Sequence, residues 1–113
     1  PPPISTLFPY TTLFRSIAGQ VPINPSTSKV VEGGIKEQAQ QVLKNIGEIL
    51  HAAGYDFSHV VKTTCLLSSM SDFQAMNEVY ARFFETDPPA RVTYAVKELP
   101  LHALVEIEMI AAK

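Results

Sequence analysis

The feature that most constrains the fold is the alternation of two one-sided helical patterns with β-branched runs. Between Gly34 and Gly54 the apolar residues recur at three- and four-residue spacing, which predicts an amphipathic helix that ends at Gly54. A second helix is predicted to begin at a cap, Ser71 or Asp72, and to end at the stretch "ETDPP". Each helix must bury its apolar face against another element.

Strands are predicted in residues 59–67, 91–96 and 103–112, where β-branched and aromatic residues concentrate. With a strand ahead of the first helix, the predicted order is β-α-β-α-β-β. Two long amphipathic helices are buried most economically on one face of a single sheet. We therefore expect an α+β two-layer domain with a mostly antiparallel or mixed sheet. The short connection "KELPLHA" predicts that the last two strands pair antiparallel.

Both faces of this predicted sheet are apolar. In the strand of residues 59–67, strict alternation places two sets of side chains on opposite faces: Val60, Thr64 and Leu66 on one, and Val61, Thr63, Cys65 and Leu67 on the other. A single layer of helices covers only one face, and a large apolar patch is uncommon on a soluble monomer. We therefore expect the second face to be buried against other copies of the chain.

Composition limits the classes of function. The net charge of −2 provides no basic field for a nucleic-acid backbone, so nucleic acid is disfavoured as a partner. The apolar stretches fall short of the roughly 20 residues that a membrane-spanning helix needs, so no membrane association is expected. The single cysteine, Cys65, fits the cytosol or the mitochondrial matrix. Its β-branched surroundings predict a buried strand residue rather than a nucleophile.

Charged residues in the last two strands are the candidates for chemistry. Glu106 and Glu108 share the face away from the helices, about 7 Å apart along the strand. If Thr93 pairs opposite Glu106, Arg91 lies opposite Glu108 on the same face, whereas a slip by one residue turns Arg91 toward the helices. Arg91 could form an interfacial ion pair with a glutamate. Alternatively, its planar fork could bind a substrate carboxylate while a glutamate handles a proton or a water. The histidines lack the spacing of a metal site, and none is predicted.

The first residues do not share this patterning. Residues 1–16, "PPPISTLFPYTTLFRS", are proline-rich, and residues 6–16 match the conceptual translation of a common sequencing adapter. We therefore interpret residues 1–16 as a non-native segment and residues 17–113 as the folded domain. The alternative is a natural proline-rich arm in which "TTLFRSIA" forms a strand.

Four stretches resemble the RidA (YjgF) family of enamine/imine deaminases: "AGQVPINPSTSKVVEGGIKEQAQQVLKNIGEILHAAG", "VVKTTCLLSSMSDFQAMNEVYARFF", "PPARVTYAV" and "VEIEMIAA". The resemblance implies a chorismate-mutase-like fold assembled as a homotrimer, with the strands in a central barrel, the helices outside and an active site in each subunit cleft. It also implies hydrolysis of 2-iminoacids such as 2-iminopropanoate and 2-iminobutanoate to 2-oxoacids and ammonia. It implies neither a metal nor an organic cofactor.

The resemblance also carries residue roles. Arg91 matches the family arginine that holds the substrate carboxylate, and Glu106 matches the residue that positions the attacking water. Thr93 matches a position often occupied by cysteine, whose backbone contacts substrate, and Asn77 matches a family asparagine at the site.

The N-terminal side of the site departs from the family. Ala18 and Gly19 of "AGQ" match the usual "SGQ", so a serine hydroxyl is missing, although the Gly19 amide could still contact substrate. Relatives also carry a "GPY" loop and a first strand ahead of this motif. Tyr10 imitates the tyrosine of that loop but lies too close to Gly19 in sequence to take its place.

Two other functions remain open at this point. One is RNA cleavage that inhibits translation, a label that some relatives carry, and the net charge argues against tight RNA binding. The other is a non-catalytic trimer that binds small carboxylates through Arg91.

Overall fold

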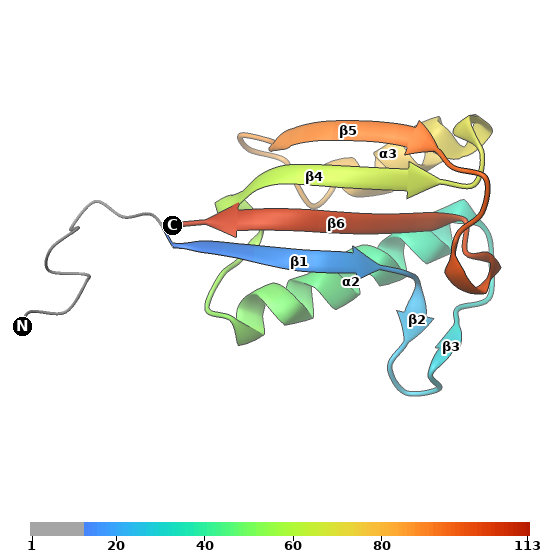
Figure 1. Ribbon diagram of the computed structural model, residues 1–113, viewed down its shortest axis with the longest axis horizontal. Coiled ribbons are helices and arrows are strands. Elements are labelled where there is room, and N and C mark those ends of the chain that lie inside the picture. Colours follow the sequence, from blue (N-terminus) through green and yellow to red (C-terminus); the bar gives the residue numbers. More distant parts are fainter. Residues whose placement is uncertain (1–12) are drawn as a thin grey trace, which may run out of the picture.

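The computed structural model describes residues 13–113, which form one sheet, one small hairpin and two helices (Figure 1). The predictions for residues 1–12, Tyr10 included, lie outside the described residues. The elements are β1 (Phe14–Gln20), β2 (Ile23–Asn24), β3 (Lys29–Val30), α2 (Ile35–Ala52), β4 (Val60–Leu67), α3 (Phe73–Ala81), β5 (Ala90–Ala95) and β6 (Val105–Ala112). Short 3₁₀ turns occupy Phe57–His59, Met70–Asp72 and Pro100–His102.

The main sheet is mixed and has the strand order β1-β6-β4-β5. Strand β6 pairs antiparallel with both β1 and β4, whereas β4 and β5 are parallel. Helices α2 and α3 lie together on one face of the sheet (Figure 1). The predicted α+β fold, with a mixed sheet and two helices on one face, is therefore confirmed. The β2–β3 hairpin is an addition that the sequence patterns did not indicate.

The predicted pairing of the last two strands is wrong, because β4 lies between β5 and β6. Strands β4 and β5 are joined through α3, and a strand-helix-strand connection returns the chain parallel to its start. The segment from β5 to β6, which includes the turn at Pro100–His102, then passes β4 and places β6 on its other side. The shortness of that segment was a poor guide, since it only has to cross two strand spacings, roughly 10 Å.

Helix α2 begins and ends where the sequence predicts. Gly34 is the extended N-cap residue, and its N–H donates to the Glu37 carboxylate at 2.9 Å. Beyond the last turn, Gly54 has a φ of 82°, a conformation that glycine adopts without steric strain.

Helix α3 begins after one of its two predicted cap residues but ends earlier than predicted. Asp72 occupies the cap position, but its side chain makes no capping hydrogen bond. Ser69 caps the preceding 3₁₀ turn instead, accepting from the Ser71 N–H at 3.2 Å. The helix ends at Ala81, before "ETDPP", so it presents fewer turns to the sheet than the pattern suggested.

The alternation of β6 is as predicted, and that of β4 is only partly so. Val105, Ile107 and Met109 are buried beneath the helices, whereas Glu106 and Glu108 lie on the other face. The buried residues of β4 that alternate in step with them are Thr63, Cys65 and Leu67. At the start of β4 the expected faces are exchanged: Val60 is buried and Val61 is exposed, because the register shifts between Val60 and Lys62.

The sheet face opposite the helices, here called the open face, carries large exposed apolar side chains. They come from three strands, of which β5 is not adjacent to the other two: Phe14 of β1, Val92 and Tyr94 of β5, and Ile110 of β6. Exposed apolar groups gathered on one sheet face indicate an interaction surface. Within residues 13–113, no helix combines the length and apolar character needed to cross a membrane.

Candidate functional site

Arg91 lies in β5 with its side chain on the helix side of the sheet. It pairs in register with Thr63 of β4, which is buried beneath the helices, and parallel partners project to the same face. One guanidinium N–H donates to the Asn77 side-chain oxygen at 2.7 Å. The guanidinium carbon lies 4.6 Å from the Tyr80 ring centre and 5.4 Å from the Phe73 ring centre. Arg91 is therefore held by an amide and two aromatic rings.

All three groups that hold Arg91 come from one face of α3. Phe73, Asn77 and Tyr80 are spaced four and three residues apart, which places them in a row along an α-helix. The contacts of Phe73 and Tyr80 with Arg91 show that this row faces β5. The local sequence thus places a ring, an amide and a second ring opposite the Arg91 guanidinium.

A cavity of about 400 Å³ opens beside Arg91. Its lining contains one charged group, the guanidinium, and is otherwise aromatic, aliphatic or amide: Asn77, Tyr80, Ala81, Phe84, Pro88, Pro89 and Arg91. The two prolines restrict the backbone that leads into β5. A small anion with an apolar portion suits such a lining.

Beneath the guanidinium lies a buried polar layer. The Tyr80 and Thr63 hydroxyls share a hydrogen bond of 2.8 Å, and burial raises the pKa of Tyr80 above its usual range. Burial also raises the pKa of the Cys65 thiol to about 11, and the nearby Arg91 charge offsets this only in part. A thiol with so high a pKa is a poor nucleophile. The prediction that Cys65 is a buried strand residue is confirmed.

Thr93 lies on the same side of β5 as Arg91, in register with buried Cys65. Its Oγ1 is buried and, among the described residues, has no hydrogen-bond partner. Thr93 is not among the residues that line the cavity beside Arg91.

Glu106 lies on the open face of β6, flanked by a bulge in β1. The register of β1 against β6 shifts between Ile17 and Gln20, so Ala18 and Gly19 form the extra length of the bulge. A methyl group added at Gly19 would lie 2.9 Å from the Glu106 carboxyl carbon. Glycine is therefore required for the carboxylate to sit against the β1 backbone.

Of the two orientations considered for Arg91, the structure has the one toward the helices, so Arg91 and Glu106 lie on opposite faces of the sheet within one chain. The side chains level with Glu106 on the open face are Leu66 and Tyr94, not Thr93. Arg91 forms no ion pair within residues 13–113, so an interfacial ion pair with a glutamate of another copy stays a prediction.

Comparison with known proteins identifies the family. The profile of the family described as Endoribonuclease L-PSP matches residues 10–113. The chain belongs to this family. The resemblance to RidA (YjgF) proteins is thereby confirmed.

Individual relatives agree with this assignment. A RutC family protein of Pyrococcus horikoshii is 53% identical over 88% of this chain and 79% of its own length. The 2-iminobutanoate/2-iminopropanoate deaminase of Mus musculus is 53% identical over 86% of this chain and 72% of its own. The crystal structure of the Rid family protein YyfA from Yersinia pestis superposes with a TM-score of 0.86 at 44% identity, covering 88% of this chain and 80% of that one.

Two residues that contact Arg91 were not among the site residues predicted from the sequence. Phe73 and Tyr80 have the helical spacing of core residues, and Tyr80 is buried. Their contact with Arg91 adds a second role. The spacing around Asn77 was the available indication, since it puts ring, amide and ring in one row.

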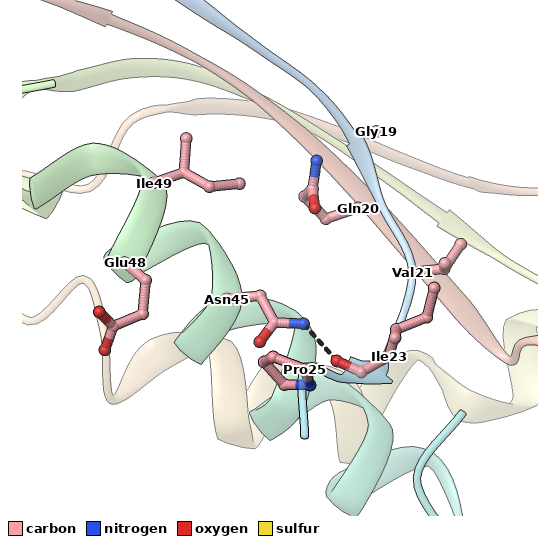
Figure 2. Close-up of a pocket in the computed structure, with 8 residues that line it drawn as sticks. All are labelled: Gly19, Gln20, Val21, Ile23, Pro25, Asn45, Glu48 and Ile49. Atoms are coloured by element: carbon pink, nitrogen blue, oxygen red, sulfur yellow. Dashed lines mark hydrogen bonds between the residues drawn. The ribbon is translucent and has the colours of Figure 1, made fainter. Parts of the chain in front are cut away.

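A second cavity, of about 500 Å³, lies between the end of β1, the β2–β3 hairpin and α2 (Figure 2). The Asn45 amide donates to the Ile23 carbonyl at 2.7 Å, which ties α2 to the hairpin there. The cavity's one ionisable side chain is Glu48, and of the predicted site residues it includes only Gly19. It offers no cation for a carboxylate ligand. Across residues 13–113, no group of three or more His, Cys, Asp or Glu side chains could hold a metal ion.

Proposed function

We propose that this chain hydrolyses 2-iminobutanoate and 2-iminopropanoate to the corresponding 2-oxoacids and ammonia. The mouse and human proteins of that name are 53% and 50% identical to it over 86% and 84% of its length. The observation that carries the proposal is the state of Arg91. Its guanidinium borders a cavity, is bonded to an amide, and has no acidic partner among residues 13–113.

Arg91 binds the substrate carboxylate in this proposal. A guanidinium presents parallel N–H donors that match a carboxylate, and the charge makes those hydrogen bonds strong. Asn77 holds one N–H group and leaves the others for the ligand. The backbone of Thr93 and the amides near Ala18 and Gly19 would add contacts to the reacting end of the substrate.

Glu106 activates the attacking water in this proposal. The carboxylate takes a proton as the water oxygen attacks the imine carbon, and the electrons of the C=N bond move to nitrogen, which is protonated. The resulting carbinolamine collapses: its amino nitrogen takes the proton held by Glu106, its hydroxyl proton passes to the carboxylate so regenerated, the C–N bond breaks, and ammonia leaves with the 2-oxoacid as the second product. The imine carbon is already electrophilic, so orientation and proton transfer are the main requirements.

We further propose that each active site combines Arg91 of one copy with Glu106 of a neighbouring copy in a homotrimer. The opposite facing of the two side chains within one chain supports a site that a second copy completes. The exposed apolar residues of the open face, among them Tyr94 and Ile110, supply a surface for that copy to cover. A trimer with its strands in a central barrel would bury this face.

Mixing two inactive variants tests the proposal. The rate of 2-oxobutanoate release is measured with 2-iminobutanoate generated by an amino-acid oxidase. Arg91→Ala and Glu106→Ala should each abolish acceleration of that rate. Chains of the two variants, denatured and refolded together, should regain activity at about one quarter of the sites, because random mixing pairs an intact Arg91 with an intact Glu106 that often. Wild-type rates in both single variants would refute the residue roles. Absence of complementation in mixed trimers would refute the shared site.

Two alternatives give different results in the same samples. An RNA-cleaving protein, as the family description suggests, would show RNA cleavage and salt-dependent RNA binding. The net charge of −2 disfavours it. A non-catalytic carboxylate-binding trimer would bind 2-oxobutanoate through Arg91 without accelerating deamination.

Two further assignments complete the proposal. We place the protein in the cytosol or an organelle such as the mitochondrial matrix, and a relative from Arabidopsis thaliana is named as chloroplastic. We also propose that residues 1–16 are non-native, although strand β1 runs across residue 16. The 5′ end of the natural gene tests both.

A further inference from the structure

The groups that hold Arg91 share one property, which is that none carries a charge. Two are aromatic rings, Phe73 and Tyr80, and the third is the amide of Asn77. A buried or half-buried arginine is ordinarily fixed by a carboxylate, since an acid supplies both hydrogen bonds and countercharge. Within residues 13–113 of one chain, the groups that fix this guanidinium are all neutral.

Neutral contacts and an ion pair have opposite consequences for a ligand. A ring face attracts a cation through its quadrupole, and an amide oxygen accepts one hydrogen bond, but neither cancels the positive charge. A carboxylate in the same place would compete with an anionic ligand for the guanidinium. The arrangement around Arg91 therefore restricts its position while its charge stays available.

The Tyr80 ring is itself held in place. Its hydroxyl is bonded to the buried Thr63 hydroxyl at 2.8 Å, and its ring packs on Phe84 with 4.7 Å between centres. Thr63 belongs to β4, the strand that pairs in register with the strand of Arg91. The Tyr80 ring and the Arg91 guanidinium are thus both attached to the same part of the sheet, the paired strands β4 and β5.

We infer that Phe73, Asn77 and Tyr80, together the neutral clamp, are positioning residues that hold the Arg91 guanidinium for the carboxylate of a 2-iminoacid without neutralising it. This inference rests on the proposed function and assigns roles to Phe73 and Tyr80 in it. The clamp acts on binding: it prepares the cation before the substrate arrives and takes no part in proton transfer.

Asn77→Asp tests the neutrality of the clamp. The two side chains have nearly the same shape, so the substitution places a carboxylate oxygen where the amide oxygen now lies, 2.7 Å from the Arg91 nitrogen. We expect the melting temperature to stay or rise, and KM to rise about 10- to 100-fold with kcat nearly unchanged, as for a lost charged hydrogen bond made equally in ground and transition states. Gln74→Glu is the matched control, because it makes the same charge change at an exposed position of the same helix.

Ring substitutions test the positioning. Tyr80→Leu removes the ring and should raise KM, whereas Tyr80→Phe keeps the ring and should raise it less. The Arg91 Nε–H proton resonance reports the geometry without any substrate, because two nearby rings shift it from the position of a free arginine. That shift should disappear in the double variant Phe73→Leu and Tyr80→Leu.

The outcomes separate the clamp from the proposed function. A wild-type protein that deaminates 2-iminobutanoate, with an Asn77→Asp variant of unchanged KM, overturns the clamp and keeps the function. An Arg91 resonance at the free-arginine position in the wild type overturns the clamp whatever the activity. A wild-type protein that neither deaminates the iminoacid nor binds 2-oxobutanoate overturns the function, and with it the ligand assigned to the clamp.

Discussion

Gly19→Ala should reduce turnover while leaving the fold intact. The backbone at Gly19 is not in the left-handed region, so alanine brings no conformational strain there. Its methyl group would, however, meet the Glu106 carboxylate, with the carboxyl carbon 2.9 Å away and the preceding methylene carbon 3.2 Å away. Because the carboxylate is the flexible end of a side chain, it moves and the backbone stays.

The size of the effect follows from that contact. Ordinary van der Waals contact begins at 3.4 Å, so the Glu106 carboxyl carbon must retreat from 2.9 Å by at least half an ångström. A misplacement of about 1 Å lowers a rate roughly 100-fold, so a loss of about 10- to 100-fold in kcat is expected. Replacing glycine by alanine at a compatible position changes the free energy of unfolding by about 1 kcal/mol or less, in the stabilising direction.

The assay compares kcat for 2-iminobutanoate with the urea midpoint of the same variant. Gly34→Ala is the matched control, since the nearest neighbour of its methyl group would be a Glu37 carboxylate oxygen at 3.8 Å, in ordinary contact. Wild-type kcat in Gly19→Ala, alongside a strong loss in Glu106→Ala, would show that the carboxylate acts without a fixed position. That result would refute the reasoning from the bulge.

Three further outcomes are expected. Thr63→Val should lower the free energy of unfolding by about 1–3 kcal/mol, because the buried Tyr80 hydroxyl loses its partner, and a urea titration with no change would contradict this. The pKa of the Cys65 thiol is about 11 in the folded state, above the ordinary 9.0. The free energy of unfolding that the neutral thiol contributes is therefore fully present below pH 9 and is lost as pH rises toward 11, by up to about 3 kcal/mol. Unfolding midpoints across that range, in the wild type and Cys65→Ala, measure it; parallel curves would exclude it. Tyr94→Glu should dissociate the proposed trimer, as seen by a solution mass measurement, and an unchanged mass would mean that the open face is not the interface.

The fold was predictable where local periodicity decides it. Helix α2 between Gly34 and Gly54 and the alternation of β6 follow from spacing alone, because burial on one side imposes a period on the sequence. The start of β4 was not predictable in this way. One extra residue at Val61 exchanges the faces, and a bulge leaves no mark in the apolar pattern.

The same distinction applies to the site: the identities of its residues were predictable, but the faces they occupy were not. Arg91 and Glu106 stand out in the sequence because a chain with few charges places them in apolar strands, whereas only the family resemblance points to Asn77. Which face each occupies depended on strand pairing, and pairing is a contact between segments far apart in sequence. The insertion of β4 between β5 and β6 turned Arg91 toward α3.

The sequence by itself determined the kinds of element, their order and the groups available for chemistry, because backbone propensity and one-sided burial are local properties. Only the tertiary structure decided that the cation and the carboxylate lie on opposite faces of the sheet, since the neighbour of a strand is chosen by packing of the whole chain. It also decided that rings and an amide, rather than an acid, surround the cation, because those contacts exist only once α3 packs on β5.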